Sequence, residues 1–138
     1  MDRINENLYI GDSSDYKNPD LSQLDTVINL STINLEIKEQ LERPVIDIPL
    51  EDGRNELPNF FLAADTVKNE IQREGTTILV NCREGVSRSP AVTAAALASI
   101  NETSFDEELD KIKEVRPKVH PLPQVIKQCK YYLGEDIE

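Results

Sequence analysis

The chain has 138 residues, a formal net charge of −11 and a sequence pI of about 4.5. Its length suits one domain with its own hydrophobic core, so we expect a single domain over residues 1–138. The acidic balance disfavours nucleic acid or an anionic membrane surface as a partner, and no apolar run is long enough to act as a leader or to cross a bilayer.

Short runs rich in β-branched and apolar residues predict four strands, over residues 8–10, 26–30, 45–48 and 77–80. Between the last two runs, apolar side chains recur at helical spacing. The apolar face of this predicted helix consists of Phe60, Ala64, Val67 and Ile71.

Three further helices are predicted after the last strand. Residues 91–100 are apolar on nearly every side, which is typical of a buried central helix. Ser104 and Glu107 fit a capping box at the start of the next helix, which ends before Pro117. Its apolar stripe holds Leu109, Ile112 and Val115. The last stripe holds Leu122, Val125, Ile126, Cys129 and Leu133, and Gly134 closes it.

This alternation of strands and helices predicts the α/β class. We expect a central, mostly parallel sheet of four to five strands flanked by helices. In such sheets ligands bind at the carboxyl ends of the strands, which directs attention to the segment that follows residues 77–80.

That segment is Asn-Cys-Arg-Glu-Gly-Val-Ser-Arg-Ser-Pro, residues 81–90. It places Cys82 between a strand end and a helix N-terminus, where unpaired N–H groups attract anions and stabilise a thiolate nucleophile. Arg88 adds a planar guanidinium that matches phosphate oxygens. Together these features predict a phosphate-ester hydrolase with a covalent cysteine intermediate. The alternatives without catalysis are that Cys82 is a buried structural residue and that Arg88 forms an ordinary salt bridge at the surface.

The loop that follows Cys82 is expected to hold the phosphate with its backbone N–H groups, and Gly85 lets it close tightly. The predicted phosphate-binding residues are Arg83, Glu84, Gly85, Val86, Ser87 and Arg88.

The Cys-x5-Arg-Ser string of residues 82–89 resembles the signature of the cysteine-dependent protein tyrosine phosphatases. Residues 7–11, 26–30, 48–52 and 115–117 extend the similarity to the small dual-specificity phosphatases along nearly the whole chain. The resemblance implies a phosphatase loop between a central strand and a helix N-terminus. It also implies a phosphorylated protein or peptide substrate, with phosphotyrosine and also phosphoserine or phosphothreonine as targets. Neither a metal nor an organic cofactor is implied, and a free thiolate suits a reducing, cytoplasmic location.

A departing alkoxide or phenoxide needs a proton, and Asp52 is the predicted general acid. It lies thirty positions before Cys82 in a loop marked by Gly53, and the family places an aspartate after a similar Ile-Pro segment. Glu51 is the alternative, and both carboxylates could instead be surface charges. Ser89 is expected to donate a hydrogen bond to the departing thiolate, or to cap the following helix.

Two positions depart from the family pattern. Asn81 stands where relatives usually have a histidine that stabilises the thiolate, so we expect less stabilisation here. An Asn side chain can still donate a hydrogen bond to a loop carbonyl and so keep the shape of the loop. Leu122 stands where relatives often have asparagine. His120 is expected to be structural or to face solvent, and Cys129 to lie in the core.

Two other functions remain open from the sequence. One is a phosphatase of RNA 5′ ends or of another non-protein phosphate, which the lack of a basic stripe disfavours. The other is a phosphate-binding module without turnover, which the presence of Cys82, Arg88 and the acid disfavours. The sequence does not indicate an oligomeric state.

Overall fold

The computed structural model describes residues 1–17, 19–32 and 44–135. Over these residues five strands form one sheet in the order β1-β2-β5-β3-β4, in which only the pair β1–β2 is antiparallel. The strands are β1 (Asp2–Asn5), β2 (Leu8–Gly11), β3 (Thr26–Asn29), β4 (Val45–Asp47) and β5 (Ile78–Asn81). The predicted α/β class and mostly parallel sheet are therefore confirmed, and β1 is an additional strand that the sequence patterns did not indicate.

The central strand is β5, which pairs with β2 on one side and β3 on the other. Its apolar residues are fully buried, as expected for a parallel strand that is covered on both faces. Gly11 and Asn29 both lie in register with Asn81, so β2, β3 and β5 end at the same level of the sheet. The segments that follow these strands therefore meet around Cys82.

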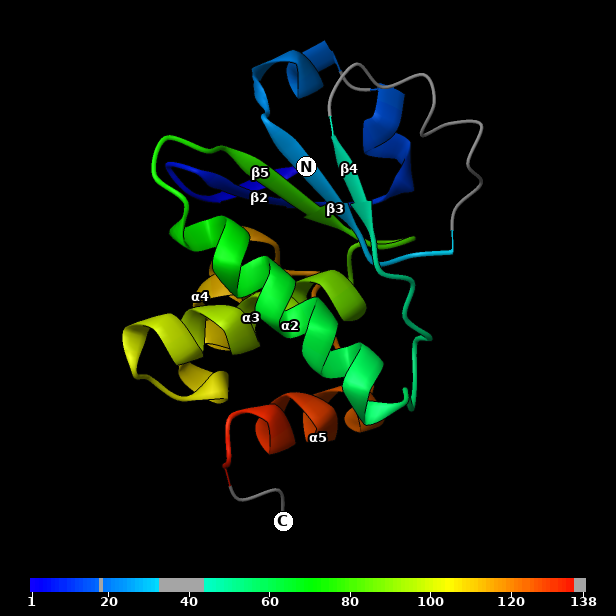
Figure 1. Ribbon diagram of the computed structural model, residues 1–138, viewed down its shortest axis with the longest axis vertical. Helices are drawn as coiled ribbons and strands as arrows, with labels where there is room; N and C mark the ends of the chain where they lie inside the picture. The colour runs from blue at the N-terminus through cyan, green and yellow to red at the C-terminus, as the bar shows by residue number, and fades with distance from the viewer. Residues whose placement is uncertain (18, 33–43, 136–138) are drawn as a thin grey trace.

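The two faces of the sheet are covered differently (Figure 1). One face carries the helices α2 (Leu57–Gln72), α3 (Arg88–Asn101), α4 (Phe105–Val115) and α5 (Pro123–Tyr132). The other face carries two short 3-10 helices, η1 (Ser13–Lys17) and η2 (Pro19–Gln23). Tyr16, Leu21 and Leu24 pack there on Val27 and Leu79 of the sheet.

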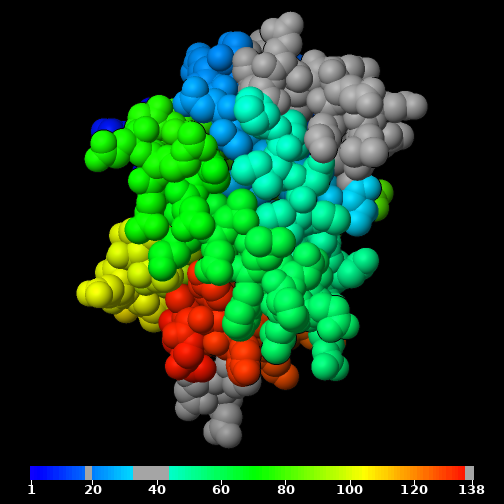
Figure 2. All heavy atoms as spheres, viewed as in Figure 1, coloured from blue at the N-terminus to red at the C-terminus, as the bar shows by residue number. Residues whose placement is uncertain are grey.

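Helix α3 is the centre of the helical layer and contacts α2, α4 and α5. Its residues from Ser89 to Ala98 are buried, and the many alanines let the neighbouring helices approach closely. The predicted central helix is confirmed and begins three residues earlier, at Arg88. Figure 2 shows α2 (green) and α5 (orange to red) next to each other on the surface. None of the described helices is both long and apolar enough to cross a membrane.

The predicted helix ends at Ser104 and Gly134 are confirmed, whereas two residues of the predicted apolar stripes are not buried. Ser104 Oγ accepts a hydrogen bond from Glu107 N at 3.1 Å, which confirms the cap of α4, and Gly134 has the positive φ of a helix stop. The predicted stripes are wrong at Val115, which is 41% exposed, and at Leu122, which is 39% exposed. Val115 is the last residue of α4, where the chain turns inward to bury Arg116 instead, and Leu122 precedes α5.

Candidate active site

The phosphatase loop, residues 82–88, connects the end of β5 to the first turn of α3. Cys82 is only 2% exposed and lies at the base of this loop. Its Sγ accepts a hydrogen bond from Ser89 N at 3.4 Å and lies 3.3 Å from Ser89 Oγ. The thiol therefore lies against the first turn of α3, where the helix N-terminus carries a partial positive charge.

Arg88 is the first residue of α3 and one of its guanidinium nitrogens is already engaged. Nη1 donates to the carbonyl oxygen of Leu50 at 2.8 Å. Within the described part of the chain, its buried Nε has no hydrogen-bond partner. An unpaired buried donor is uncommon in a folded protein and costs stability, so this nitrogen is available to a ligand.

A pocket of about 380 Å³ is lined by three of the four predicted catalytic residues, and the fourth, Ser89, lies buried behind Cys82. It is lined by Asp52, Cys82, Arg83, Glu84, Val86, Ser87, Arg88, His120 and Leu122. Glu51 instead lines a neighbouring groove of about 1190 Å³, so the residue of this pair that shares a pocket with Cys82 is Asp52. Among the described residues, no cluster of three or more His, Cys, Asp or Glu side chains is placed to hold a metal ion.

Other predicted residues are placed as follows. Gly85 is buried behind the loop rather than in the pocket wall, and His120 is exposed at the pocket. Cys129 lies in the core, where its thiol donates to Ala91 O at 3.4 Å, and burial raises the pKa of this thiol. The capping alternative for Ser89 is wrong, because Ser87 occupies the N-cap position of α3 and Ser89 lies inside the first turn.

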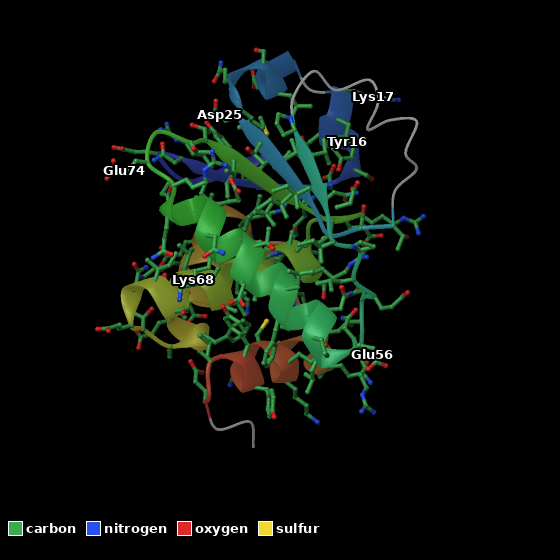
Figure 3. All side chains as sticks on the ribbon, in the orientation of Figure 1. Tyr16, Lys17, Asp25, Glu56, Lys68 and Glu74 are labelled. Carbon is green, nitrogen blue, oxygen red and sulfur yellow. The ribbon has the colours of Figure 1, made fainter. Side chains whose placement is uncertain are left out.

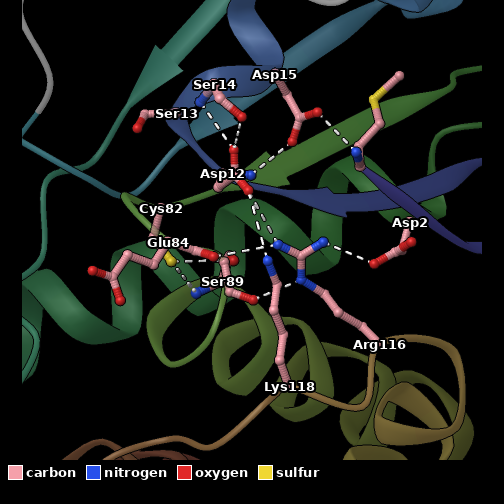
Figure 4. A network of polar contacts seen from close by, with 12 residues as sticks. Asp2, Asp12, Ser13, Ser14, Asp15, Cys82, Glu84, Ser89, Arg116 and Lys118 are labelled. Atoms are coloured by element: carbon pink, nitrogen blue, oxygen red, sulfur yellow. Dashed lines mark hydrogen bonds and ion pairs between the residues drawn. The ribbon is translucent and has the colours of Figure 1, made fainter.

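Arg116 supports the phosphatase loop from behind and was not identified from the sequence as a functional residue (Figure 4). Its side chain is buried, and Nε donates to Gly85 O at 2.8 Å while Nη2 donates to Glu84 O at 3.3 Å. The same guanidinium forms ion pairs with Asp2 at 2.8 Å and Asp12 at 3.4 Å. By holding the two loop carbonyls on this side, Arg116 fixes the conformation of the loop around Cys82.

Position 85 tolerates only glycine because the chain packs so closely there. Its φ is +67°, and a Cβ there would collide with the guanidinium of Arg116 and lie 2.7 Å from the carbonyl oxygen of Gly11. Burial acts to raise the pKa of Asp12, but hydrogen bonds from Ser14 and the charge of Arg116 outweigh it and leave that pKa lowered. The ion pair behind the loop therefore stays charged at neutral pH.

Asn81 is fully buried in a row of polar side chains under the loop. Tyr16 donates from its hydroxyl to Asn81 Oδ1 at 3.0 Å, and Asn81 Nδ2 donates to Asn29 Oδ1 at 3.5 Å. Asn29 in turn donates to Asp47 at 3.0 Å. The partner of the Asn81 amide nitrogen is thus Asn29 on the neighbouring strand β3, rather than a loop carbonyl. Figure 3 shows Tyr16 on η1, beside the sheet.

Because Tyr16 is part of this row, the free energy of unfolding should depend on pH in the alkaline range. Burial raises the pKa of Tyr16 to about 12, from an ordinary value of 10.0. Between pH 10 and 12 the unfolded chain therefore loses the phenolic proton while the folded chain keeps it. The contribution of the protonated Tyr16 to the free energy of unfolding is therefore fully present below pH 10. That free energy should fall as the pH rises from 10 to 12.

Tyr16→Phe should flatten this alkaline fall and cost about 1 kcal/mol at pH 8, because Asn81 loses its donor. Urea unfolding of both proteins at pH 8 and pH 11 checks the expectation. A wild-type decline that the variant reproduces in full would show that another group titrates.

The family model of the dual specificity phosphatase catalytic domain matches residues 8–133. The chain is 30% identical over 125 residues to the tyrosine-protein phosphatase vhp-1 of Caenorhabditis elegans, which covers 86% of this chain and 19% of that protein. It is 31% identical over 88 residues to mouse dual specificity protein phosphatase 19, which covers 64% of this chain and 38% of that protein. The chain thus spans only a minor part of these two relatives.

One relative of similar length and one solved structure also match the chain. The putative tyrosine phosphatase 123R of Invertebrate iridescent virus 6 is 27% identical over 127 residues, or 91% of this chain and 87% of the viral protein. The crystal structure of human DUSP28 superposes with a TM-score of 0.83 at 21% identity, covering 97% of this chain and 96% of that one. The structural likeness supports the fold, and the family model spans nearly all of the chain. The protein therefore belongs to the family of dual specificity phosphatase catalytic domains.

Proposed function

We propose that this protein is a cysteine-dependent phosphatase of phosphorylated proteins, acting on phosphotyrosine and also on phosphoserine or phosphothreonine. The observation that carries the proposal is that Cys82 and Arg88, whose Nε has no hydrogen-bond partner among the described residues, line one pocket at the N-terminus of α3. A phosphoryl group would satisfy that nitrogen while presenting its phosphorus to the thiolate.

In the first step the Cys82 thiolate attacks phosphorus, and the bond from phosphorus to the ester oxygen breaks. Arg88 and the N–H groups of residues 83–88 hold the three non-bridging oxygens as charge redistributes in the transition state. Asp52, which lines the same pocket, donates its proton to the leaving oxygen. The products of this step are the dephosphorylated side chain and a phosphocysteine.

In the second step water attacks phosphorus and the bond from phosphorus to sulfur breaks. The Asp52 carboxylate left by the first step takes the proton of the water. Ser89 Oγ, 3.3 Å from Sγ, donates a hydrogen bond to the departing thiolate. Inorganic phosphate leaves and the free thiolate is restored.

The proposal extends to the setting of this chemistry. One domain over residues 1–138 would carry the activity, in a reducing, cytoplasmic location that keeps Cys82 free. The names of the relatives favour phosphoprotein substrates over RNA 5′ ends or another non-protein phosphate. No part of the proposed reaction requires a metal or an organic cofactor.

Asp52→Asn tests the assignment of the acid. Good leaving groups need little protonation, so the variant should lose kcat/KM on phenyl phosphate by on the order of 10²-fold and on 4-nitrophenyl phosphate far less.

Glu51→Gln is the matched control, since it neutralises the adjacent carboxylate, which lies in the neighbouring groove. It should retain the wild-type dependence on the leaving group. Equal losses on both substrates in Asp52→Asn, with a leaving-group effect in Glu51→Gln, would transfer the role to Glu51.

A further inference from the structure

The loop that carries Asp52 is folded on itself by a buried side chain. We call residues 51–55, between β4 and α2, the acid loop. Asn55 Oδ1 accepts a hydrogen bond from Glu51 N at 2.7 Å, and Asn55 Nδ2 donates to Glu51 O at 3.0 Å and to Gly53 O at 3.3 Å. The Asn55 amide thus ties both sides of the turn that presents Asp52.

The same asparagine is fixed to α5 through its backbone. Gln128 Oε1 accepts from Asn55 N at 3.1 Å, and Gln128 Nε2 donates to Asn55 O at 2.6 Å. One primary amide therefore pairs with both backbone groups of one residue, which sets the orientation of the acid loop as well as its position. Both residues are 8% exposed, so water competes little for these bonds. Glu56, which directly follows the acid loop and precedes α2, is labelled in Figure 3.

The other end of the acid loop is held by the phosphatase loop. Arg88 Nη1 donates to Leu50 O at 2.8 Å, directly before Glu51. Within the described residues the Asp52 carboxylate itself makes no hydrogen bond or ion pair, and the residue is exposed. Its place over the pocket is therefore determined by the backbone anchors at Leu50 and Asn55, rather than by bonds of its own.

We propose that Gln128 is a positioning residue for the general acid, acting through Asn55 to hold Asp52 over the pocket before substrate binds. The inference rests on the proposed function, because it needs Asp52 to be the proton donor. Proton transfer depends on hydrogen-bond distance to the leaving oxygen, so a loop displaced by about 1 Å should slow this step strongly. Gln128 should accordingly affect protonation of the leaving group and spare the binding of oxyanions.

The test uses Gln128→Met, which keeps the length of the side chain and removes all three hydrogen bonds between the Gln128 amide and Asn55, including that from Asn55 Nδ2 to Gln128 Oε1 at 3.4 Å. Its control is Lys127→Met. Lys127 is the exposed neighbour on α5, and its replacement should leave activity unchanged. In Gln128→Met, kcat/KM should fall about tenfold or more on phenyl phosphate and about twofold on 4-nitrophenyl phosphate. Vanadate should bind within about twofold of wild type.

The decisive experiment introduces Gln128→Met into the Asp52→Asn protein and measures the double variant. Once the acid is absent, misplacing its loop should cost nothing further on phenyl phosphate. Additive losses, or equal losses on both substrates in the single variant, would overturn the inference. If Asp52→Asn itself shows no leaving-group effect, the proposed role of Asp52 fails instead, which distinguishes the two failures.

Gln128→Glu gives a second measurement that also serves if Gln128→Met does not fold. The carboxylate still accepts from Asn55 N but repels Asn55 O, whereas the protonated acid donates to it as the amide does. Burial raises the pKa of the introduced carboxyl above the ordinary glutamate value of about 4.3. The activity of this variant on phenyl phosphate, relative to wild type at each pH, should therefore recover as the pH is lowered from about 8 to about 4. A ratio that stays constant across this range would count against a positioning role.

Discussion

Cys82→Ser should abolish turnover of aryl phosphates while oxyanion binding persists. A serine hydroxyl is far less acidic than a thiol, so the nucleophile is lost and kcat should fall by on the order of 10⁴-fold or more. The N–H group of Ser89 and the guanidinium of Arg88 remain, so vanadate should still raise the midpoint of thermal unfolding through linkage. Turnover that survives in the purified variant would exclude the covalent mechanism.

Cys129→Ser is the matched control for this experiment. It also removes a thiol, but Cys129 lies in the core and its burial raises the pKa, so the native thiol is neutral and inaccessible. The control should keep its activity at temperatures where it remains folded. In the native protein, rapid alkylation by iodoacetamide should disappear with Cys82→Ser and persist with Cys129→Ser.

Arg88→Lys should be nearly as damaging, although it preserves the charge. The guanidinium donates through Nη1 to Leu50 O and leaves Nε for the phosphoryl group, and a single ammonium cannot occupy both positions. We expect kcat/KM on 4-nitrophenyl phosphate to fall on the order of 10³-fold.

Arg73→Lys provides the comparison, because Arg73 is a largely exposed side chain that pairs with Glu70 at the end of α2. It should be indistinguishable from wild type in kcat/KM. Near-normal catalytic efficiency of Arg88→Lys would mean that Arg88 does not contact the transferring group.

The parts of this molecule that follow from local sequence were predictable. The path from β5 through the phosphatase loop to α3 was predicted because an apolar strand, a glycine-containing loop and an alanine-rich helix follow one another directly. Asp52 was proposed as the acid because it follows a predicted strand and precedes a glycine, and because the family that the chain resembles places an aspartate after a similar Ile-Pro segment. The strand β1 was missed because Asp2–Asn5 is short and mostly polar, with alternating residues only half-buried at a sheet edge.

The supporting residues were missed because their partners are distant in sequence. Gln128 lies 73 positions from Asn55 on a stripe that otherwise indicates only helix packing. Tyr16 lies 65 positions from Asn81, in a segment without helical periodicity. A polar residue inside an apolar stripe, as at Gln128, is the one local signal that could have drawn attention to a buried contact.

The ion pairs of Arg116 have a consequence for how the protein acquires activity as it folds. They join Arg116 to Asp2, 114 positions away, and to Asp12, 104 positions away, and the same side chain shapes the loop at Gly85. Contacts between such distant residues can form only once the intervening strands and helices have brought the two ends of the domain together. Partly folded species that already contain the sheet and α3 would thus lack a finished loop. Recovery of phosphatase activity during refolding should lag behind recovery of secondary structure, and the nascent chain would stay inert until Arg116 has docked.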